Sequence, residues 1–250
     1  MKQVFFGIEY EFDRDEVDRI IEEHIVDKQP GYVVSLDGTN FSIAMKNKKH
    51  LDLLNSAIVN NCDSHWVPKM VNSIYGTNYS NYIGADLFIN YIDKRKYKQF
   101  FLGGNKKVLN GLKEQLIKHD PAIERMRFEE LPFCSVDDFD YPSIADMINK
   151  DEPDIIWVSL GCPKQEQFMA KLKPYLNQGV MFGFGAIFNF YSGLEDAPKR
   201  APQWMLDRGL EFLYRIYSEP RKQIKRCWGI IRVFPKAYFH ELLHKKNNKR

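Results

Sequence analysis

The fold is decided by the stretch between residues 155 and 202, which reads IIWVSLGCPKQEQFM (155–169), VMFGFGAIFNFYSG (180–193) and APKRAP (197–202). Two apolar runs in this stretch each end in a loop that contains glycine. In an open α/β sheet, ligands bind at the carboxyl ends of the strands, where such loops gather. Small residues there let backbone N–H groups approach a bound phosphate or sugar. We therefore expect this stretch to form part of a ligand site.

Further apolar runs alternate with segments of helical periodicity along the rest of the chain. The expected strands cover residues 4–8, 32–36, 57–59, 99–102, 126–128, 155–160 and 180–184. The first expected helix begins after Asp13 or Asp15. Further helices are expected at residues 38–45, 67–75, 108–116, 144–148 and 168–176. This alternation predicts an α/β fold with a mostly parallel sheet that helices cover on both faces.

The last fifth of the chain differs from the rest in charge and in pattern. Residues 199–250 carry 14 Lys and Arg against 4 Asp and Glu, a net charge of +10 in a chain whose total is +3. A basic end on an acidic body suggests an anionic surface as partner. From Gln203 onwards the pattern is helical only. We therefore expect an α/β catalytic domain at residues 1–198 and a helical basic appendage at residues 199–250.

The final predicted helix begins at Pro220, which suits the first turn of a helix. Ile224, Trp228 and Ile231 share one of its faces, beside several Lys and Arg residues. Such a helix can lie in a membrane interface and bind an anionic leaflet. Nucleic-acid binding and a solvated charged face are the alternatives, and the aromatic residues among the cations favour the membrane. Pro235 is expected to bend or end this helix.

Cysteine spacing and hydropathy argue against several classes of protein. Cys62, Cys134, Cys162 and Cys227 show no C-x-x-C spacing, so neither a disulfide framework nor a zinc site is expected. The N-terminus becomes acidic too early for a signal peptide, and no apolar run approaches the roughly 20 residues of a membrane span. The body of the chain is therefore expected to be soluble and cytoplasmic.

Two glycine-bearing turns between a strand and a helix could hold an anion. The segment GCPKQE (161–166) opens a helix, whose N-terminus attracts anions, and Gln165 and Glu166 could bond sugar hydroxyls. Gly103 and Gly104 occupy a similar turn but lack the dinucleotide and P-loop signatures. A plain connection between strand and helix remains the alternative for both turns.

Acidic residues at strand ends are candidates for the chemistry. Asp63 follows a predicted strand in a neutral loop, where a carboxylate can act as a general base, and the alternative is a cap for the helix at 67–75. Asp37 has a similar position and the same alternative of a helix cap, and it can instead be a turn aspartate. Two D-x-D patterns, at 13–15 and 138–140, match those of metal-dependent sugar transferases, but neither follows a strong apolar strand.

Five segments together resemble a known family. They read IGADLF (83–88), FLGGN (101–105), WVSLGCPKQEQF (157–168), GFGAIFNFYSG (183–193) and KRAPQWMLDRGLEFLYRIYSEPRK (199–222). With these motifs the chain resembles the WecG/TagA/CpsF family of bacterial glycosyltransferases, which is glycosyltransferase family 26. The resemblance extends over residues 5–232 and is most specific between residues 155 and 221.

The resemblance implies a Rossmann-like fold of the GT-E type and an inverting transfer that uses no metal or other cofactor. A hexose or N-acetylhexosamine would pass from a UDP-sugar to a saccharide linked to polyprenyl diphosphate, in the synthesis of a bacterial surface polysaccharide such as capsule or exopolysaccharide. The basic appendage would engage the anionic inner face of the cytoplasmic membrane and complete the active site. The enzyme would be peripheral to that membrane, with no nucleic acid as partner and with a homo-oligomer left open.

The resemblance also implies roles for individual residues. Asp63 matches the family's proposed catalytic base, although its flanking residues differ from the family pattern. Asp37 stands where the family has asparagine, so a hydrogen-bond donor to the substrate is replaced by an acceptor or by a second carboxylate. Arg215 and Arg221 match appendage arginines that would stabilise the departing UDP, and Arg226 matches less closely. The implied substrate-binding residues are Ser35, Asp37, Asp86, Gly103, Gly104, Gly161, Pro163, Gln165, Glu166, Gly183, Gly185, Asn189 and Arg200.

Two other classes of protein remain open at this point. A metal-dependent transferase could use Asp138 and Asp140. A non-catalytic nucleotide-sugar-binding component of a polysaccharide assembly complex could keep the same fold without turnover. The intact Gln165-Glu166 motif and the presence of Asp63 favour catalysis.

Overall fold

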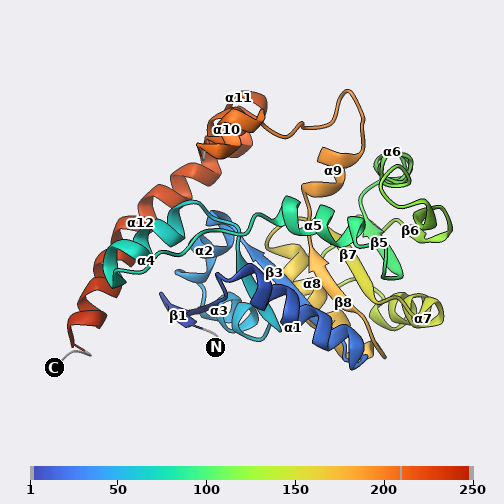
Figure 1. The fold of residues 1–250 in the computed structure, drawn as a ribbon, viewed down its shortest axis with the longest axis horizontal. Helices are drawn as coiled ribbons and strands as arrows, with labels where there is room; N and C mark the ends of the chain where they lie inside the picture. The colour runs from blue at the N-terminus through green and yellow to red at the C-terminus, as the bar shows by residue number, and fades with distance from the viewer. Residues whose placement is uncertain (1–2, 209, 248–250) are drawn as a thin grey trace.

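The computed structural model of the chain describes residues 3–208 and 210–247 and is built on one six-stranded parallel sheet (Figure 1). The strand order is β4-β3-β8-β7-β5-β6, and each neighbouring pair is parallel. The strands are β3 (Gly31–Leu36), β4 (Val59–Cys62), β5 (Gln99–Gly103), β6 (Arg127–Glu129), β7 (Ile155–Ser159) and β8 (Val180–Gly183). The predicted α/β fold with a parallel sheet is confirmed.

Each face of the sheet carries its own hydrophobic core. On β7, Ile156 and Val158 belong to one core, while Ile155 and Trp157 belong to the other. Successive side chains of a strand leave on opposite faces, so a strand covered on both sides must be apolar throughout. This requirement explains why β7 and β8 read as almost continuous apolar runs in the sequence.

Helices cover both cores (Figure 1). The first core is covered by α2 (Gly38–Ala44), α3 (Lys48–Asn55), α4 (Trp66–Tyr75), α7 (Tyr141–Asp151) and α8 (Lys164–Leu172). The second core is covered by α1 (Arg14–Val26), α5 (Gly84–Asp93), α6 (Lys106–Leu116) and α9 (Ile187–Tyr191). Two short 3-10 helices, Pro121–Arg125 and Lys173–Tyr175, precede β6 and β8.

The N-terminus departs from the single strand expected at residues 4–8. It forms a hairpin of β1 (Gln3–Phe5) and β2 (Ile8–Tyr10), joined by Phe6 and Gly7 with positive φ angles of 57° and 76°. Two consecutive positive φ angles reverse the chain within two residues. A continuous strand is therefore the wrong prediction for this segment.

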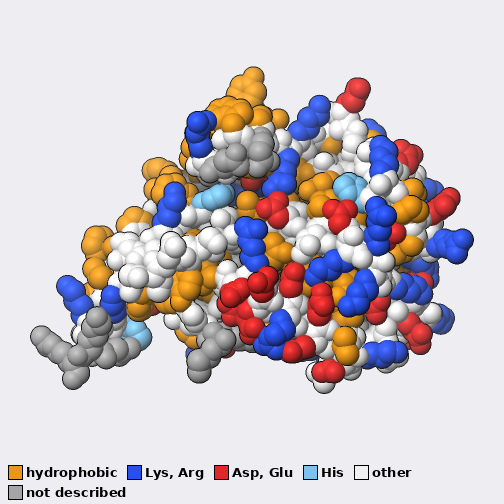
Figure 2. Space-filling view, viewed as in Figure 1, with side chains coloured by type: hydrophobic (Ala, Val, Ile, Leu, Met, Phe, Trp, Pro, Cys, Tyr) orange, Lys and Arg blue, Asp and Glu red, His pale blue; other side chains and the backbone are white. Residues whose placement is uncertain are grey.

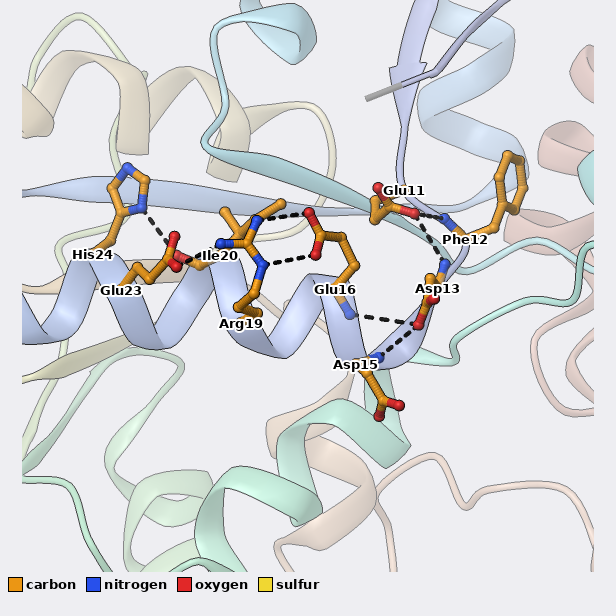
Figure 3. A network of polar contacts seen from close by, with 9 residues as sticks. All are labelled: Glu11, Phe12, Asp13, Asp15, Glu16, Arg19, Ile20, Glu23 and His24. Carbon is orange, nitrogen blue, oxygen red and sulfur yellow. Dashed lines mark hydrogen bonds and ion pairs between the residues drawn. The ribbon is translucent and has the colours of Figure 1, made fainter. Parts of the chain in front are cut away.

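Helix α1 begins where the sequence predicts it, and Asp13 is its cap (Figure 3). The Asp13 carboxylate accepts hydrogen bonds from the backbone N–H groups of Asp15 and Glu16, at 3.0 and 3.4 Å. Along the exposed face, Arg19 pairs with Glu16 and Glu23. One aspartate of the first D-x-D pattern is thus used to begin a helix.

The C-terminal part is helical, as predicted, and consists of α10 (Gln203–Asp207), α11 (Glu211–Ser218) and α12 (Pro220–Asn247). Helix α12 packs on α2 and α4 (Figure 1), and its Val233 and Ala237 are buried in the first core. It does not end at Pro235, because contacts on both sides of the proline hold the helix where one backbone hydrogen bond is lost. Within residues 3–208 and 210–247, no helix is both long enough and apolar enough to cross a membrane.

Candidate active site

A cavity of about 670 Å³ opens at the carboxyl ends of β3, β4 and β8. One wall comes from the loops that follow these strands and β7, and the opposite wall comes from α11 and α12. The appendage thus lies across the edge of the sheet where ligands are expected. The predicted site residues that line this cavity are Ser35, Asp37, Asp63, Gly161, Gln165, Gly183, Gly185, Arg200 and Arg215.

Asp63 lies partly buried in this cavity, just beyond the end of β4. Its Oδ1 accepts a hydrogen bond from the backbone N–H of Gly84, at 3.1 Å. At the start of the following helix, α4, the Ser64 hydroxyl accepts hydrogen bonds from the N–H groups of Trp66 and Val67. Asp63 is therefore not the cap of α4. Its Oδ2 forms no hydrogen bond within the described residues and is left for the cavity.

Burial raises the pKa of Asp63 to about 7, well above the ordinary range of an aspartate. The carboxylates of Asp37 and Glu211 also raise this pKa, whereas the Gly84 N–H and the Arg215 guanidinium lower it. A group with a pKa near neutrality can take up and release a proton at physiological pH, as a general base must. A pKa shifted by burial and by specific charges inside a cavity is typical of functional sites.

Gly84 is a site residue that the sequence reasoning did not single out. A β-carbon at this position would lie 2.6 Å from Ser35 Oγ and 3.3 Å from Asp63 Oδ2. Asn61 restrains Ser35 from the other side by donating to its hydroxyl at 2.9 Å. Glycine therefore lets the first residue of α5 approach both side chains. The segment IGADLF (83–88), which contains it, was the one signal in the sequence that pointed here.

Asp37 caps α2 and also lines the cavity. Its Oδ1 accepts hydrogen bonds from the backbone N–H groups of Thr39 and Asn40, at 3.0 and 2.8 Å. The alternative that Asp37 is a helix cap is therefore confirmed, and its position at the cavity is compatible with both roles. Because one carboxylate oxygen is used by the helix, the orientation of Asp37 is set by the backbone of α2.

Gln165 joins the two glycine-bearing loops that follow β7 and β8. Its Oε1 accepts from the N–H groups of Gly161 and Gly185, both at 3.0 Å, and its Nε2 donates to the carbonyl of Gly183 at 2.8 Å. Nε2 also donates to Glu166 Oε1 at 2.9 Å. The protein thus uses every hydrogen-bonding position of the amide. This geometry supports a positioning role, and a direct contact between Gln165 and a sugar stays a prediction.

Glu166 belongs to a buried polar network behind these loops. Its Oε1 also accepts from Asn40 Nδ2 at 3.2 Å, and Asn40 Oδ1 accepts from His50 Nε2 and Cys162 Sγ. Burial raises the pKa of Glu166, which favours the neutral acid, and its Oε2 finds no hydrogen-bond partner among the described residues. Glu166 therefore supports the cavity wall from behind without lining it, and its predicted contact with substrate stays a prediction.

Two arginines of the appendage reach the cavity with a carboxylate partner. Arg200 pairs with Asp86 of α5 at 2.9 Å, which brings these two predicted residues together. Arg215 pairs with Glu211 at 2.8 Å and lies over the ring of Phe190, 5.0 Å from its centre. Both guanidinium groups are thus held in place before any ligand binds.

Two further arginines lie in the first turns of α12. Arg226 borders the cavity near Cys162, and it forms no ion pair within the described part of the chain. Arg221 is exposed and lies outside the cavity lining. The arginine that matches the family less closely is thus the one at the cavity, and a role for Arg221 stays a prediction.

A second cavity, of about 530 Å³, lies at the carboxyl ends of β5 and β7. The chain leaves these neighbouring strands in opposite directions, since β5 leads to the edge strand β6 and β7 leads to β8, so this is a topological switch point. Gly104 borders this cavity. Gly103 has a φ angle of 95°, and a β-carbon there would lie 2.6 Å from the carbonyl oxygen of Ser159. Gly103 thus allows a tight turn, and Gly104 lies at the cavity.

The loop between β7 and α8 borders both cavities. Gly161 and Cys162 line the first cavity, and Lys164 lines the second. Pro163 occupies the N-cap position of α8 and lines neither. Asn189, in α9, is also outside both linings. Substrate contacts of Pro163 and Asn189 therefore stay predictions.

The second D-x-D pattern lies outside both cavities. Asp138 accepts a hydrogen bond from Ser135 Oγ at 2.7 Å, and Asp140 caps α7 by accepting from the Ser143 N–H at 3.1 Å. Among the described residues, no group of three or more His, Cys, Asp and Glu side chains is arranged to hold a metal ion. The placement of Asp138 and Asp140 gives no support to the alternative that assigns metal binding to them.

A parallel α/β sheet with a carboxylate, arginines and glycine-bearing loops at its carboxyl edge is typical of group-transfer enzymes that act on anionic substrates. The sequence profile of the glycosyl transferase WecG/TagA/CpsF family matches residues 5–248. The chain belongs to this family and is a glycosyltransferase. The resemblance carried by the sequence motifs is thereby confirmed.

Two curated relatives align with most of the chain. The N-acetylglucosaminyldiphosphoundecaprenol N-acetyl-beta-D-mannosaminyltransferase of Bacillus subtilis (strain 168) is 27% identical over 233 residues, which cover 92% of this chain and 86% of the relative. The enzyme of the same name from Bacillus spizizenii (strain ATCC 23059 / NRRL B-14472 / W23) is 30% identical over 207 residues, which cover 81% of this chain and 75% of the relative. Both names describe a transferase that acts on a sugar carried by diphosphoundecaprenol.

Proposed function

We propose that this enzyme moves a hexose or an N-acetylhexosamine from a UDP-sugar to a saccharide linked to polyprenyl diphosphate. The transfer inverts the anomeric carbon, needs no metal ion, and takes place at the inner face of the bacterial cytoplasmic membrane during the synthesis of a surface polysaccharide. The names of the relatives support a lipid-linked acceptor. The observation that carries the proposal is Asp63, a carboxylate with a pKa of about 7 in a cavity that arginines also line.

Inversion requires a single in-line displacement at the anomeric carbon. The acceptor hydroxyl attacks from the side opposite to the departing UDP, and Asp63 Oδ2 accepts the proton of that hydroxyl as the new bond forms. The electron pair of the broken bond leaves with the diphosphate oxygen of UDP. The Gly84 N–H holds the other oxygen of Asp63 at 3.1 Å and so orients the base.

Negative charge grows on the departing UDP and needs positive partners. Arg200 and Arg215 reach the cavity from the appendage, and a guanidinium group can bind a diphosphate through two hydrogen bonds at once. We assign them the charge stabilisation that a metal ion provides in other transferases. Arg221 could join them only if the first turn of α12 moved, because it lies outside the cavity lining.

The nucleotide of the donor is proposed to extend toward the second cavity. That cavity lies at the switch point of the sheet, where ligands of open α/β folds bind. Gly104 permits close approach of the backbone to a phosphate or base, and Lys164 adds a positive charge. The loop between β7 and α8 would then hold donor and acceptor sugars in line.

A lipid-linked acceptor calls for contact with the membrane, and the appendage offers an apolar surface for it. Figure 2 shows hydrophobic side chains gathered over α10 and α11 and along α12. Exposed members of this surface are Trp204, Leu213, Tyr217, Ile224, Trp228 and Ile231. Cations lie among them, and Arg232 stacks on the ring of Trp228 at 4.7 Å. A basic surface with exposed aromatic groups suits an anionic leaflet.

The proposal is tested with a panel of UDP-sugars and acceptors linked to polyprenyl diphosphate, assayed in the presence of EDTA. We expect transfer from one of these donors, and we expect Asp63→Asn to lower kcat/KM by roughly 100-fold or more. Asp140→Asn is the matched control, because this aspartate is exposed and outside both cavities, and it should keep wild-type turnover.

Each part of the proposal has its own contrary result. Near wild-type transfer by a folded Asp63→Asn variant would place the base elsewhere. Activity that EDTA abolishes and a divalent cation restores would replace the metal-independent mechanism. If no UDP-sugar is transferred to any of these acceptors, the assigned substrates are wrong.

A further inference from the structure

We infer that the apolar half of the first cavity binds the first isoprene units of the acceptor lipid, which enter through an opening between α4, α11 and α12. This inference rests on the proposed function. It adds to that proposal a subsite for the hydrocarbon tail of the acceptor, separate from the groups that bind the sugar and the diphosphate of the acceptor.

Helix α12 turns one continuous stripe of side chains toward the cavity. The stripe consists of Gln223, Arg226, Cys227, Ile230, Ile231, Phe234 and Pro235, which recur at the spacing of a helix face. Its first turn is polar and cationic, and the next two turns are apolar. From Arg226 to Phe234 the helix rises by about 12 Å. A ligand lying along α12 would therefore meet a cation first and hydrocarbon side chains next.

The charges in the cavity favour a ligand with an anionic head. Arg200 and Arg215 each pair with a carboxylate, whereas Arg226 forms no ion pair within residues 3–208 and 210–247. An arginine without a carboxylate partner can bind a diphosphate through parallel hydrogen bonds. A polyprenyl diphosphate supplies both the anionic head and a tail that covers the apolar turns, whereas a nucleotide sugar has no such tail.

The apolar end of the cavity is open to the outside. Trp66 of α4, Phe212 of α11 and Ile231 of α12 all line the cavity, yet their exposed fractions are 52%, 38% and 61%. Leaving large apolar side chains in water at the mouth of a cavity is unfavourable unless a ligand or a membrane covers them. The three residues therefore mark an opening with an apolar rim.

This opening is continuous with the apolar surface of the appendage. Ile231 follows Ile224 and Trp228 on the same face of α12, and both of these are 57% exposed. Hydrophobic side chains along α12 are visible in the space-filling view (Figure 2). If this surface lies on the bilayer, as proposed above, a lipid tail can pass from the membrane into the cavity without crossing water.

The experiment measures binding alone and uses the full chain without membranes. Dimethylallyl, geranyl and farnesyl diphosphate share one head group and carry one, two and three isoprene units. Each is titrated by calorimetry below the concentration at which it forms micelles. We expect the dissociation constant to fall at least tenfold from the shortest to the longest of them. Ile231→Asn should reduce this gain to less than threefold.

Ile224→Asn is the matched control. Ile224 has the same side chain on the same helix, is 57% exposed against 61% for Ile231, and lies outside the cavity lining. Both variants should weaken binding to lipid vesicles to a similar degree, but only Ile231→Asn should lose the dependence on chain length. Equal affinities of the wild type for the three diphosphates would overturn the inference, as would a full gain in Ile231→Asn. Since the titration needs neither donor nor turnover, failure of the proposed reaction would show separately in the UDP-sugar panel.

Discussion

Asp63 and Asp37 both follow a strand, but different contacts hold their carboxylates. Asp37 accepts two backbone hydrogen bonds from its own helix, whereas Asp63 accepts one, from Gly84. Burial then dominates at Asp63 and raises its pKa to about 7. Two aspartates that look equivalent in the sequence therefore differ in chemistry, because only one of them begins a helix.

The raised pKa of Asp63 predicts opposite effects of pH on activity and on stability. As a base it must be ionised, so kcat/KM should rise with pH up to about 7 and then level off. In the unfolded chain the same carboxyl ionises near pH 4, so the stability due to its raised pKa is complete below about pH 4 and is lost as pH rises through 7. At pH 8, Asp63→Asn should therefore unfold at a higher urea concentration than the wild type. Its free energy of unfolding should be larger by about 2 to 4 kcal/mol.

The same comparison at about pH 3 serves as the control. Asp63 is then mostly neutral in both the folded and the unfolded chain, so the unfolding free energies of variant and wild type should agree. An equal difference between variant and wild type at both pH values would show that the effect comes from packing and not from the charge of Asp63.

Helix α12 is held to the body of the protein near its middle and near its end. In the middle, the rings of Phe41 and Phe234 lie 4.8 Å apart. Near the end, the buried carboxylate of Glu241 accepts hydrogen bonds from the Phe6 N–H at 3.0 Å and from the Tyr75 hydroxyl at 2.7 Å. These contacts lie on either side of the proline and explain why the helix continues through it.

The contact at the end of α12 predicts a measurable loss of stability. Glu241→Ala leaves the buried Phe6 N–H and the partly buried Tyr75 hydroxyl without an acceptor and should lower the free energy of unfolding by about 2 to 4 kcal/mol. Tyr75→Phe removes only one of the two hydrogen bonds and should cost about 1 kcal/mol. Urea unfolding followed by circular dichroism measures both. If Glu241→Ala unfolds at the wild-type urea concentration, this carboxylate does not hold α12.

Positive charge and exposed apolar side chains are concentrated in the same part of the molecule. Residues 199–250 carry a net charge of +10 in a chain whose total is +3, so the remaining residues are acidic. The exposed apolar side chains of α10, α11 and α12 lie in the same basic part (Figure 2). On a membrane, hydrophobic burial and attraction to anionic lipid would therefore act at one surface, and we propose that this surface orients the cavity opening toward the bilayer.

This separation predicts how vesicle binding depends on charge. Lys225→Gln together with Arg232→Gln, both at exposed positions of α12, should weaken binding to anionic vesicles by about 30-fold, because each cation near the leaflet contributes about 1 kcal/mol. Co-sedimentation with vesicles measures the change. The same two substitutions should have little effect on zwitterionic vesicles. Lys106→Gln with Lys118→Gln, in and beside α6 on the other side of the molecule (Figure 1), should leave binding to both unchanged.

Prediction from the sequence succeeded where the pattern reflects burial on both sides of an element. The runs that became β7 and β8 are examples. Prediction failed where the backbone conformation of one or two residues determines the structure, as in the hairpin at Phe6 and Gly7. Helix α5 was not expected, although its buried Leu87, Phe88, Tyr91 and Ile92 recur at the spacing of a helix face.

The sequence by itself determined the α/β fold, the basic helical end and the position of Asp63 after a strand, because apolar periodicity and charge act over many residues and survive local exceptions. Only the tertiary structure decided what each polar side chain does. It placed Gly84 against Asp63, used the amide of Gln165 to tie two loops together, and set Arg226 at the cavity while leaving Arg221 outside it. Such roles depend on which backbone groups and charges come within a few ångströms, and residues far apart in the chain supply them.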